Sequence, residues 1–172
     1  MNRLVVEVYE KQLRSLKWIY AIIVVCVLGI CSVTIVLGPP LGVIVKPSSL
    51  LLVELILGGL AAGLTLIVVP LSRQKLCNPD RVRTAPAEQL QSWGLPADID
   101  PVIGRQAVFL TRYTAGCIIS WGLSASVGLY GLITRMLGSN APISGLFLSL
   151  AVFFLLILPP RGQWLKEKLS AL

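Results

Sequence analysis

Histidine is missing from this chain of 172 residues, and charged residues make up only 13% of it. The chain therefore lacks the usual axial ligand of haem, the imidazole ligand of zinc sites and the commonest general base. Its four cysteines form no CxxC pair, which argues against an iron–sulfur or dithiol centre. No GxxxxGK[ST] or GxGxxG loop is present to hold nucleotide phosphates. The sequence predicts no enzyme, no cofactor other than a bound lipid, and no metal.

The most prominent feature of the sequence is its long apolar segments. Hydrophobic residues make up 55% of it, and the mean hydropathy is +0.82, too apolar for a soluble globule. A helical membrane span needs about 20 mostly apolar residues. The segments that qualify are Trp18–Leu37, Leu50–Leu71, Tyr113–Ile133 and the shorter Ile143–Leu158. We predict an all-α integral membrane protein in which four transmembrane helices form two hairpins.

The distribution of Lys and Arg predicts the orientation of these spans. Thirteen of the 15 cations lie in the N-terminal tail, the central loop and the C-terminal tail, and only Lys46 and Arg135 lie in the two other connections. Cytoplasmic loops carry the excess of Lys and Arg, so both termini and the long loop are expected in the cytoplasm. The basic residues are spread over three segments with few aromatics among them, so no nucleic-acid partner is expected.

The predicted organisation has five parts. They are an interfacial amphipathic helix (1–17), a first transmembrane hairpin (18–71), a cytoplasmic loop (72–112), a second transmembrane hairpin (113–158) and a cytoplasmic tail (159–172). In the first part an apolar row, spaced as on one helix face, alternates with charged residues, which is typical of a helix in the membrane interface. That row is Val6, Tyr9, Leu13 and Leu16. In the loop only Ala87–Trp93 has the pattern of a short helix.

Small residues form rows on two of the predicted spans. Gly116, Ser120, Ser124 and Gly128 are spaced four apart on the third span, and the second span carries Gly58, Gly59, Ala62 and Gly63. Such rows let helix backbones approach closely, and packing drives helix association in lipid. We expect these helices to pack on each other or on another membrane subunit, identical or different.

Glu54 is the one acid inside a predicted span. An intramembrane carboxylate is costly and indicates a function or a partner. Glu54 lies about four residues, roughly 6 Å, inside its span, and Arg135 leaves the third span at a similar height. Three interpretations follow: an ion pair between Glu54 and Arg135, extension of the carboxylate to water, or ion or proton handling by Glu54.

Two resemblances to known families accompany these patterns. The segment GLYGLI (Gly128–Ile133) resembles the stretch after the ion-binding acid in proteolipid, or c-type, subunits of rotary ATPases, although Ala125 stands where that acid would be. A broader outline is similar to small uncharacterised bacterial four-span proteins. It rests on Arg112, Trp121, Leu123, Tyr130, Gly131, Gly138, Pro159, Arg161, Lys166 and Leu169. This outline implies an architecture and a place in the bacterial inner membrane, and no activity.

Three functions are compatible with these observations. The first is a non-catalytic structural or assembly subunit of a larger membrane complex, whose partners are membrane lipids and other membrane subunits. The second is a homo-oligomeric ring or pore, similar to the proteolipid, that handles ions through Glu54. The third is a small-solute transporter, which the near absence of polar residues within the spans makes least favoured.

Overall fold

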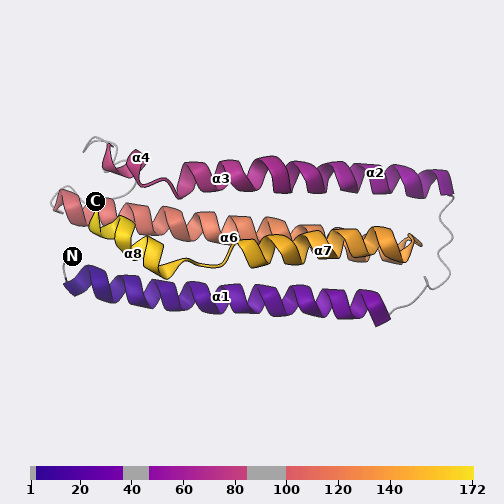
Figure 1. Ribbon diagram of the computed structural model, residues 1–172, viewed down its shortest axis with the longest axis horizontal. Helices are drawn as coiled ribbons and strands as arrows, with labels where there is room; N and C mark the ends of the chain where they lie inside the picture. The colour runs from indigo at the N-terminus through magenta and orange to yellow at the C-terminus, as the bar shows by residue number, and fades with distance from the viewer. Residues whose placement is uncertain (1–2, 37–46, 85–99) are drawn as a thin grey trace.

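The computed structural model describes residues 3–36, 47–84 and 100–172, and these ranges contain helices and no strand. The elements run side by side in one elongated bundle (Figure 1). In chain order they are α1 (Arg3–Val36), α2 (Pro47–Gly63), the π-helical turn η1 (Leu64–Val68), α3 (Val69–Leu76), α4 (Asp80–Arg83), α6 (Pro101–Met136), α7 (Ala141–Ile157) and α8 (Gly162–Ser170). The prediction of an all-helical fold is confirmed.

Among the described residues, three helical stretches are long and apolar enough to cross a membrane: Glu7–Val36, Ser48–Arg83 and Pro101–Met136. The fourth predicted span is α7, which has 17 residues and ends where Pro159 and Pro160 interrupt the helix. Helix α8 is bent by 44° from α7, and the two helices together are long and apolar enough to cross a membrane. The described residues therefore contain three candidate spans, or four if α7 and α8 count as one span. The architecture fits a multi-pass membrane protein.

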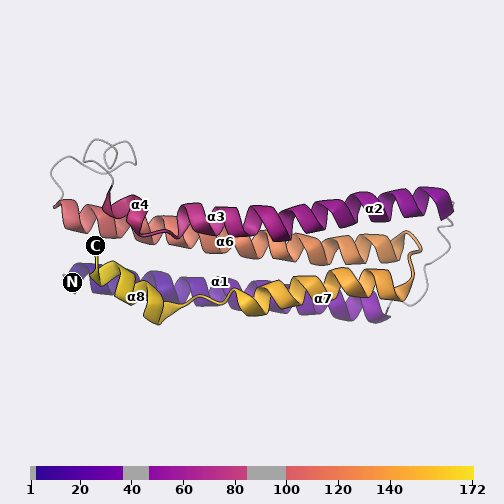
Figure 2. The same ribbon diagram turned by 45° about the horizontal axis from the view of Figure 1, so that its top comes forward.

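Helix α6 is the centre of the bundle. It packs against α1, α3 and α7, and also contacts α2, α4 and α8 (Figure 2). The side chains that fill these contacts are fully or almost fully buried. They include Phe109, Cys117, Trp121 and Val127 of α6, Val27 of α1, and Ala151 and Leu155 of α7. The core therefore runs along the length of α6.

The turn from α6 to α7 depends on a glycine. Gly138 has a φ of 103°, in the left-handed region that favours glycine, and the next N–H, of Ser139, bonds to the carbonyl of Thr134 at 3.0 Å. Helix α7 starts three residues after this glycine, at Ala141. The turn brings α6 and α7 together side by side and antiparallel.

The N-terminal part of the chain differs from the predicted interfacial helix. Helix α1 runs from Arg3 to Val36 as one helix, so its first turns extend the first span and do not form a separate helix. Tyr9 and Leu16 of the predicted apolar row are buried, and the Tyr9 hydroxyl donates to the Gly162 carbonyl at 2.7 Å. The amphipathic row faces the beginning of α8, where Leu13 lies beside Gly162 and the Gly162 carbonyl accepts the Tyr9 hydroxyl.

The central loop is shorter than predicted at both ends. Helix α3 continues to Leu76, and α6 begins at Pro101, twelve residues before the expected span. Asp100 caps α6 by accepting a hydrogen bond from the Val102 N–H at 2.9 Å, and proline is favoured at the first helical position. Hydropathy alone places a boundary where polarity changes, not where a helix ends. The predicted helix Ala87–Trp93 lies outside the described residues.

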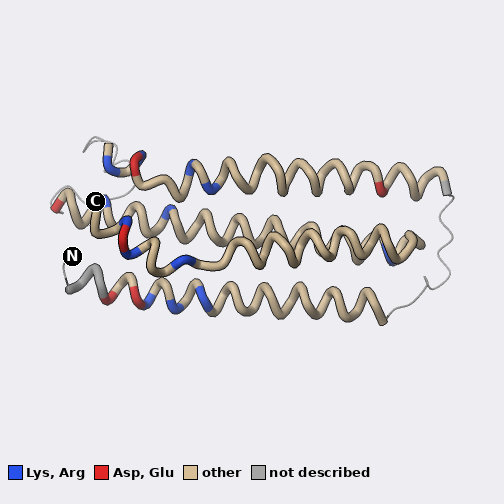
Figure 3. The backbone as a smooth tube through the Cα atoms, in the orientation of Figure 1, with Lys and Arg blue, Asp and Glu red and all other residues tan. Residues whose placement is uncertain are grey.

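Charge is concentrated at one end of the bundle, called here the charged end, which carries both chain termini, α4 and α8 (Figure 3). Helix α6 has 36 residues and is about 54 Å long, whereas a hydrocarbon core is about 30 Å thick. Helix α6 is therefore longer than the crossing of such a core requires. At the charged end α8 packs on α6, where the buried Gln106 donates to the Leu169 carbonyl at 2.9 Å.

Candidate functional site

The small-residue row of α6 is buried within the chain. Ser120 and Ser124 are fully buried, and each hydroxyl donates to the carbonyl four residues earlier in the same helix, at 2.7 and 2.8 Å. These bonds satisfy the hydroxyls without a partner from another helix, so the row behaves as a flat apolar surface. Close approach of neighbouring helices is the result.

Different helices cover different parts of this row. A Cβ atom added at Gly116 would lie 2.9 Å from the Cys77 sulfur, and one added at Gly128 would lie 3.4 Å from the Ala151 Cβ. Gly131, beside the row, is tighter still, because its added Cβ would lie 2.8 Å from the backbone oxygen of Ser144. The small residues of the α6 row therefore pack against helices of the same chain, namely the end of α3 and α7.

The small residues of α2 have no such neighbours. A Cβ atom added at Gly58, Gly59 or Gly63 would meet nothing within 4 Å, and Ala62 is exposed. Helix α2 and η1 face α6 through a different row, in which Ala61 and Thr65 are buried. The two small-residue rows do not pack on each other in the single chain. The α2 row instead forms an open face, called here the α2 small face: Gly58, Gly59, Ala62 and Gly63.

Glu54 and Arg135 lie at the same end of the bundle, opposite the charged end, but they form no ion pair in the structure. Both side chains are partly exposed, and the Arg135 guanidinium donates to the Ser139 carbonyl at 3.2 Å. Arg135 therefore closes its own turn, the one between α6 and α7. Glu54 lies one helical turn before Gly58, at the edge of the α2 small face that adjoins the buried Ala61.

At the charged end, three aromatic side chains hold the break between α7 and α8. The Tyr20 hydroxyl donates to the Leu155 carbonyl at 2.8 Å, and the Trp121 indole N–H donates to the Leu158 carbonyl at 2.7 Å. The Tyr113 hydroxyl accepts from the Arg161 N–H at 3.1 Å. Backbone groups freed by a helix break are costly in an apolar environment unless they are bonded. The aromatics of α1 and α6 supply these bonds.

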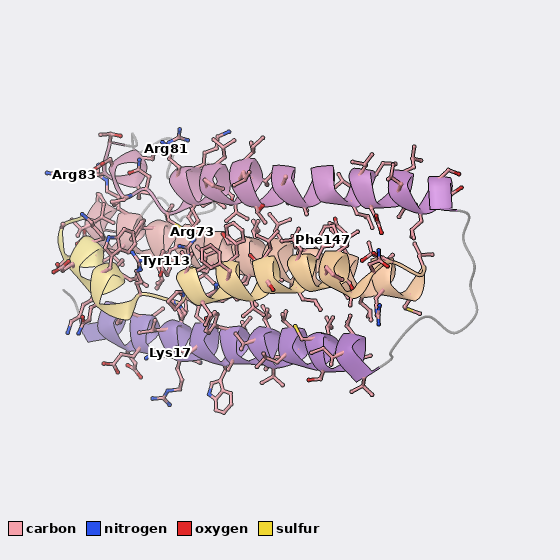
Figure 4. The ribbon with its side chains drawn as sticks, turned by 45° about the vertical axis from the view of Figure 1, so that its right-hand side comes forward. Lys17, Arg73, Arg81, Arg83, Tyr113 and Phe147 are labelled. Atoms are coloured by element: carbon pink, nitrogen blue, oxygen red, sulfur yellow. The ribbon has the colours of Figure 1, made fainter. Side chains whose placement is uncertain are left out.

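A cavity of about 280 Å³ lies beside this break, between the end of α3, α6 and the start of α8. Its lining includes Arg73, Cys77, Tyr113, Arg161 and Trp164. Figure 4 shows Arg73 close to Tyr113. Tyr113, Phe109 and Trp164 form an aromatic cluster, with the Tyr113 and Trp164 ring centroids 5.8 Å apart. The cavity thus has two cationic groups above a fixed aromatic wall.

A second cavity, of about 510 Å³, lies in the apolar part of the bundle between α1 and α7. Apart from Ser149 and a glycine, its lining is apolar or thiol: Cys31, Ile35, Leu148, Val152, Phe153 and Leu156. It is an open apolar groove, and its chemistry suits a hydrocarbon chain.

The sequence patterns did not predict the cationic cavity. In the sequence, Arg161 and Trp121 belong to the family outline, and Arg73 is one of the cations of the central loop. Arg73, Tyr113 and Arg161 are far apart in the sequence and meet only because α3 and α8 both pack on α6. The available signal was the combination of aromatic residues and cations at the ends of apolar segments.

Within the described ranges no group of three or more Cys, Asp or Glu side chains could hold a metal ion. No protein-family model matches the chain, and comparisons with curated proteins and with solved structures find no significant match.

Proposed function

We propose that this protein is a non-catalytic structural or assembly subunit of a larger membrane complex, and that the α2 small face is its docking surface for a transmembrane helix of a different subunit. The observation that carries the proposal is the open space around Gly58, Gly59 and Gly63. Without side chains to contact lipid, such a face gains most from another helix that packs against it. The α6 row is already filled by helices of the same chain.

Glu54 indicates the chemistry of the partner. Glu54 lies one helical turn before Gly58, at the edge of the α2 small face, and has no ion-pair partner within the described part of the chain. Two identical copies related by a two-fold axis would bring two Glu54 carboxylates together, and like charges in an apolar site repel. A different subunit that presents Lys, Arg or a hydrogen-bond donor at that depth avoids this repulsion. We therefore favour a heteromeric complex over a symmetric dimer.

The test is extraction in a mild detergent, followed by sizing and by mass spectrometry of the proteins that co-purify. Replacing Gly59 with leucine should reduce recovery of the partner about tenfold, because overpacking a helix interface costs about 1–3 kcal/mol. The same change should not lower the thermal stability of the isolated chain, since Gly59 has no neighbour within 4 Å in it and leucine is a better helix former than glycine. Together the two measurements separate docking from folding.

Gly29→Leu is the matched control, because Gly29 also has open space around it, but the residues one turn away on either side, Val25 and Val33, are β-branched and form no row of glycine and alanine with it. It should retain the partner. Equal loss of partner from both variants would contradict the proposal. A single large homo-oligomer that contains no other protein would favour the ring that uses Glu54.

We further propose that the charged end faces the cytoplasm in a bacterial inner membrane. The cations of the charged end support this orientation through the positive-inside rule (Figure 3). The test uses a chain whose four cysteines are replaced by alanine, with one cysteine returned at the exposed position Asn140 or Ser170. A membrane-impermeant maleimide should label N140C in intact cells and S170C only after lysis. The reverse pattern would overturn the orientation.

A further inference from the structure

Among the described residues, the cavity at the charged end is lined by positive charge without a matching anion. Arg73 and Arg161 both line it, and no described Asp or Glu does. The Nε atom of Arg73 is buried and has no hydrogen-bond acceptor in the described part of the chain, where the groups beside Arg73 are the thiols of Cys77 and Cys117. A buried donor without an acceptor costs about 1–3 kcal/mol, and more when it is charged. An anion in the cavity would remove that cost.

The cavity is built on rigid groups. Tyr113 is buried, and its hydroxyl is fixed by the Arg161 N–H at 3.1 Å. Trp164 packs on Tyr113 and Phe109, with ring centroids 5.8 and 6.3 Å away. The bond to Tyr113 also fixes the backbone of Arg161. The aromatic wall and the backbone of Arg161 are thus set before any ligand binds, which lowers the entropic cost of binding.

The position of the cavity along the bundle axis indicates which kind of anion can bind in it. Arg161 follows directly on the apolar α7 and its two prolines, and Arg73 follows the apolar part of the α2–α3 stretch. Both residues therefore lie where the apolar layer ends, the level at which lipid phosphates and interfacial tryptophans are found. Guanidinium groups bind phosphate oxygens through paired, charge-assisted hydrogen bonds.

We propose that this cavity binds a phosphate group, with Arg73 and Arg161 as its charge partners, and that the phosphate belongs to an anionic phospholipid of the leaflet at the charged end. Trp164 and Tyr113 form the wall against which the headgroup lies. The same two arginines would accept a free phosphate ion, so the experiment has to separate the two sources. The proposal is independent of the docking role of the α2 small face.

The experiment is native mass spectrometry of the purified full chain in detergent, titrated with phosphatidylglycerol, with phosphatidylcholine or with inorganic phosphate. We expect phosphatidylglycerol to bind the unmodified protein about tenfold more tightly than phosphatidylcholine, whose quaternary ammonium is repelled by the arginines. Arg73→Gln and Arg161→Gln should each weaken phosphatidylglycerol binding about tenfold. Arg161 is exposed, so its substitution keeps the fold even where that of Arg73 does not.

Arg81→Gln is the matched control, because Arg81 lies on α4, is exposed and points away from the bundle (Figure 4). It should bind phosphatidylglycerol like the unmodified protein. Competition by millimolar inorganic phosphate would support the phosphate site, and binding of inorganic phosphate without any lipid preference would assign the free ion as its source. Equal binding of the two lipids with no effect of Arg161→Gln would overturn the proposal. So would an equal loss with Arg81→Gln, which would indicate diffuse attraction by surface charge.

Discussion

Replacing Trp121 with leucine is expected to lower the free energy of unfolding by about 3–5 kcal/mol, the range for losing a large buried aromatic. Trp121 is fully buried, its ring lies 5.2 Å from that of Tyr20, and its N–H satisfies the Leu158 carbonyl at the break between α7 and α8. Leucine leaves both a void and an unbonded carbonyl. In thermal unfolding in detergent the midpoint should fall by on the order of 10 °C.

Two further variants divide this effect into its parts. Trp121→Phe keeps most of the ring but strands the Leu158 carbonyl, so it should cost about 1–3 kcal/mol. Trp18→Leu makes the same change of residue type at a side chain that is 68% exposed, and it should cost less than about 0.5 kcal/mol. If Trp18→Leu and Trp121→Leu lowered the midpoint equally, the indole could not be a support of the helix break.

The helices themselves followed from the sequence because long apolar segments have few alternatives in lipid. Backbone groups in the hydrocarbon core must be bonded internally, which leaves the helix as the ordinary solution for a single apolar segment. The predicted start of the last span, at Ile143, lies two residues from the observed start of α7 at Ala141. Asn140 and Pro142 give a local signal there, which explains why this boundary was close.

The ends of the long helices were harder to predict because hydropathy does not register them. The first turns of α1 and α6 are polar on one side and resemble interfacial or loop segments in the sequence. In the structure they continue as helices because α8 covers their apolar sides, through Leu165 and Leu169, which are both fully buried. The contact with α8 therefore decides whether these turns continue a long helix or form a separate interfacial segment, and the sequence of α1 or α6 alone does not contain that contact.

The small-residue rows, the Glu54 and Arg135 pair and the cationic cavity were predictable to different extents, because tertiary contacts decide what each of them does. A row of small residues is visible in a single helix, but whether the row is filled depends on the neighbours that the chain supplies. The α6 row is filled by α3 and α7, whereas the α2 row is left open. Glu54 and Arg135 lie at the same end of the bundle, but the guanidinium of Arg135 donates to the turn carbonyl of Ser139. The cationic cavity joins residues of three elements and has no linear motif.

Close contact between α6 and α7 gives a second strong prediction. Replacing a glycine of α6 with alanine should lower the stability at one position and raise it at another. Replacing Gly131 with alanine is expected to lower the free energy of unfolding by about 1–3 kcal/mol, as overpacking does. The new Cβ would lie 2.8 Å from the Ser144 oxygen and 3.1 Å from atoms of Leu148 and Phe147. The nearest of these atoms belongs to the backbone of α7, so the two helices would have to separate.

Gly122 and Gly128 provide the controls for this prediction. Gly122→Ala meets nothing within 4 Å and should stabilise the protein by about 0.5–1 kcal/mol, because alanine loses less backbone entropy in a helix than glycine. Gly128→Ala would place its Cβ 3.4 Å from that of Ala151, an ordinary contact, and should change stability little. Thermal unfolding of the three variants in detergent should therefore rank them as Gly122→Ala, Gly128→Ala and Gly131→Ala, from highest to lowest midpoint. A Gly131→Ala midpoint at or above that of the unmodified protein would mean that α6 and α7 are not packed backbone to backbone at this turn.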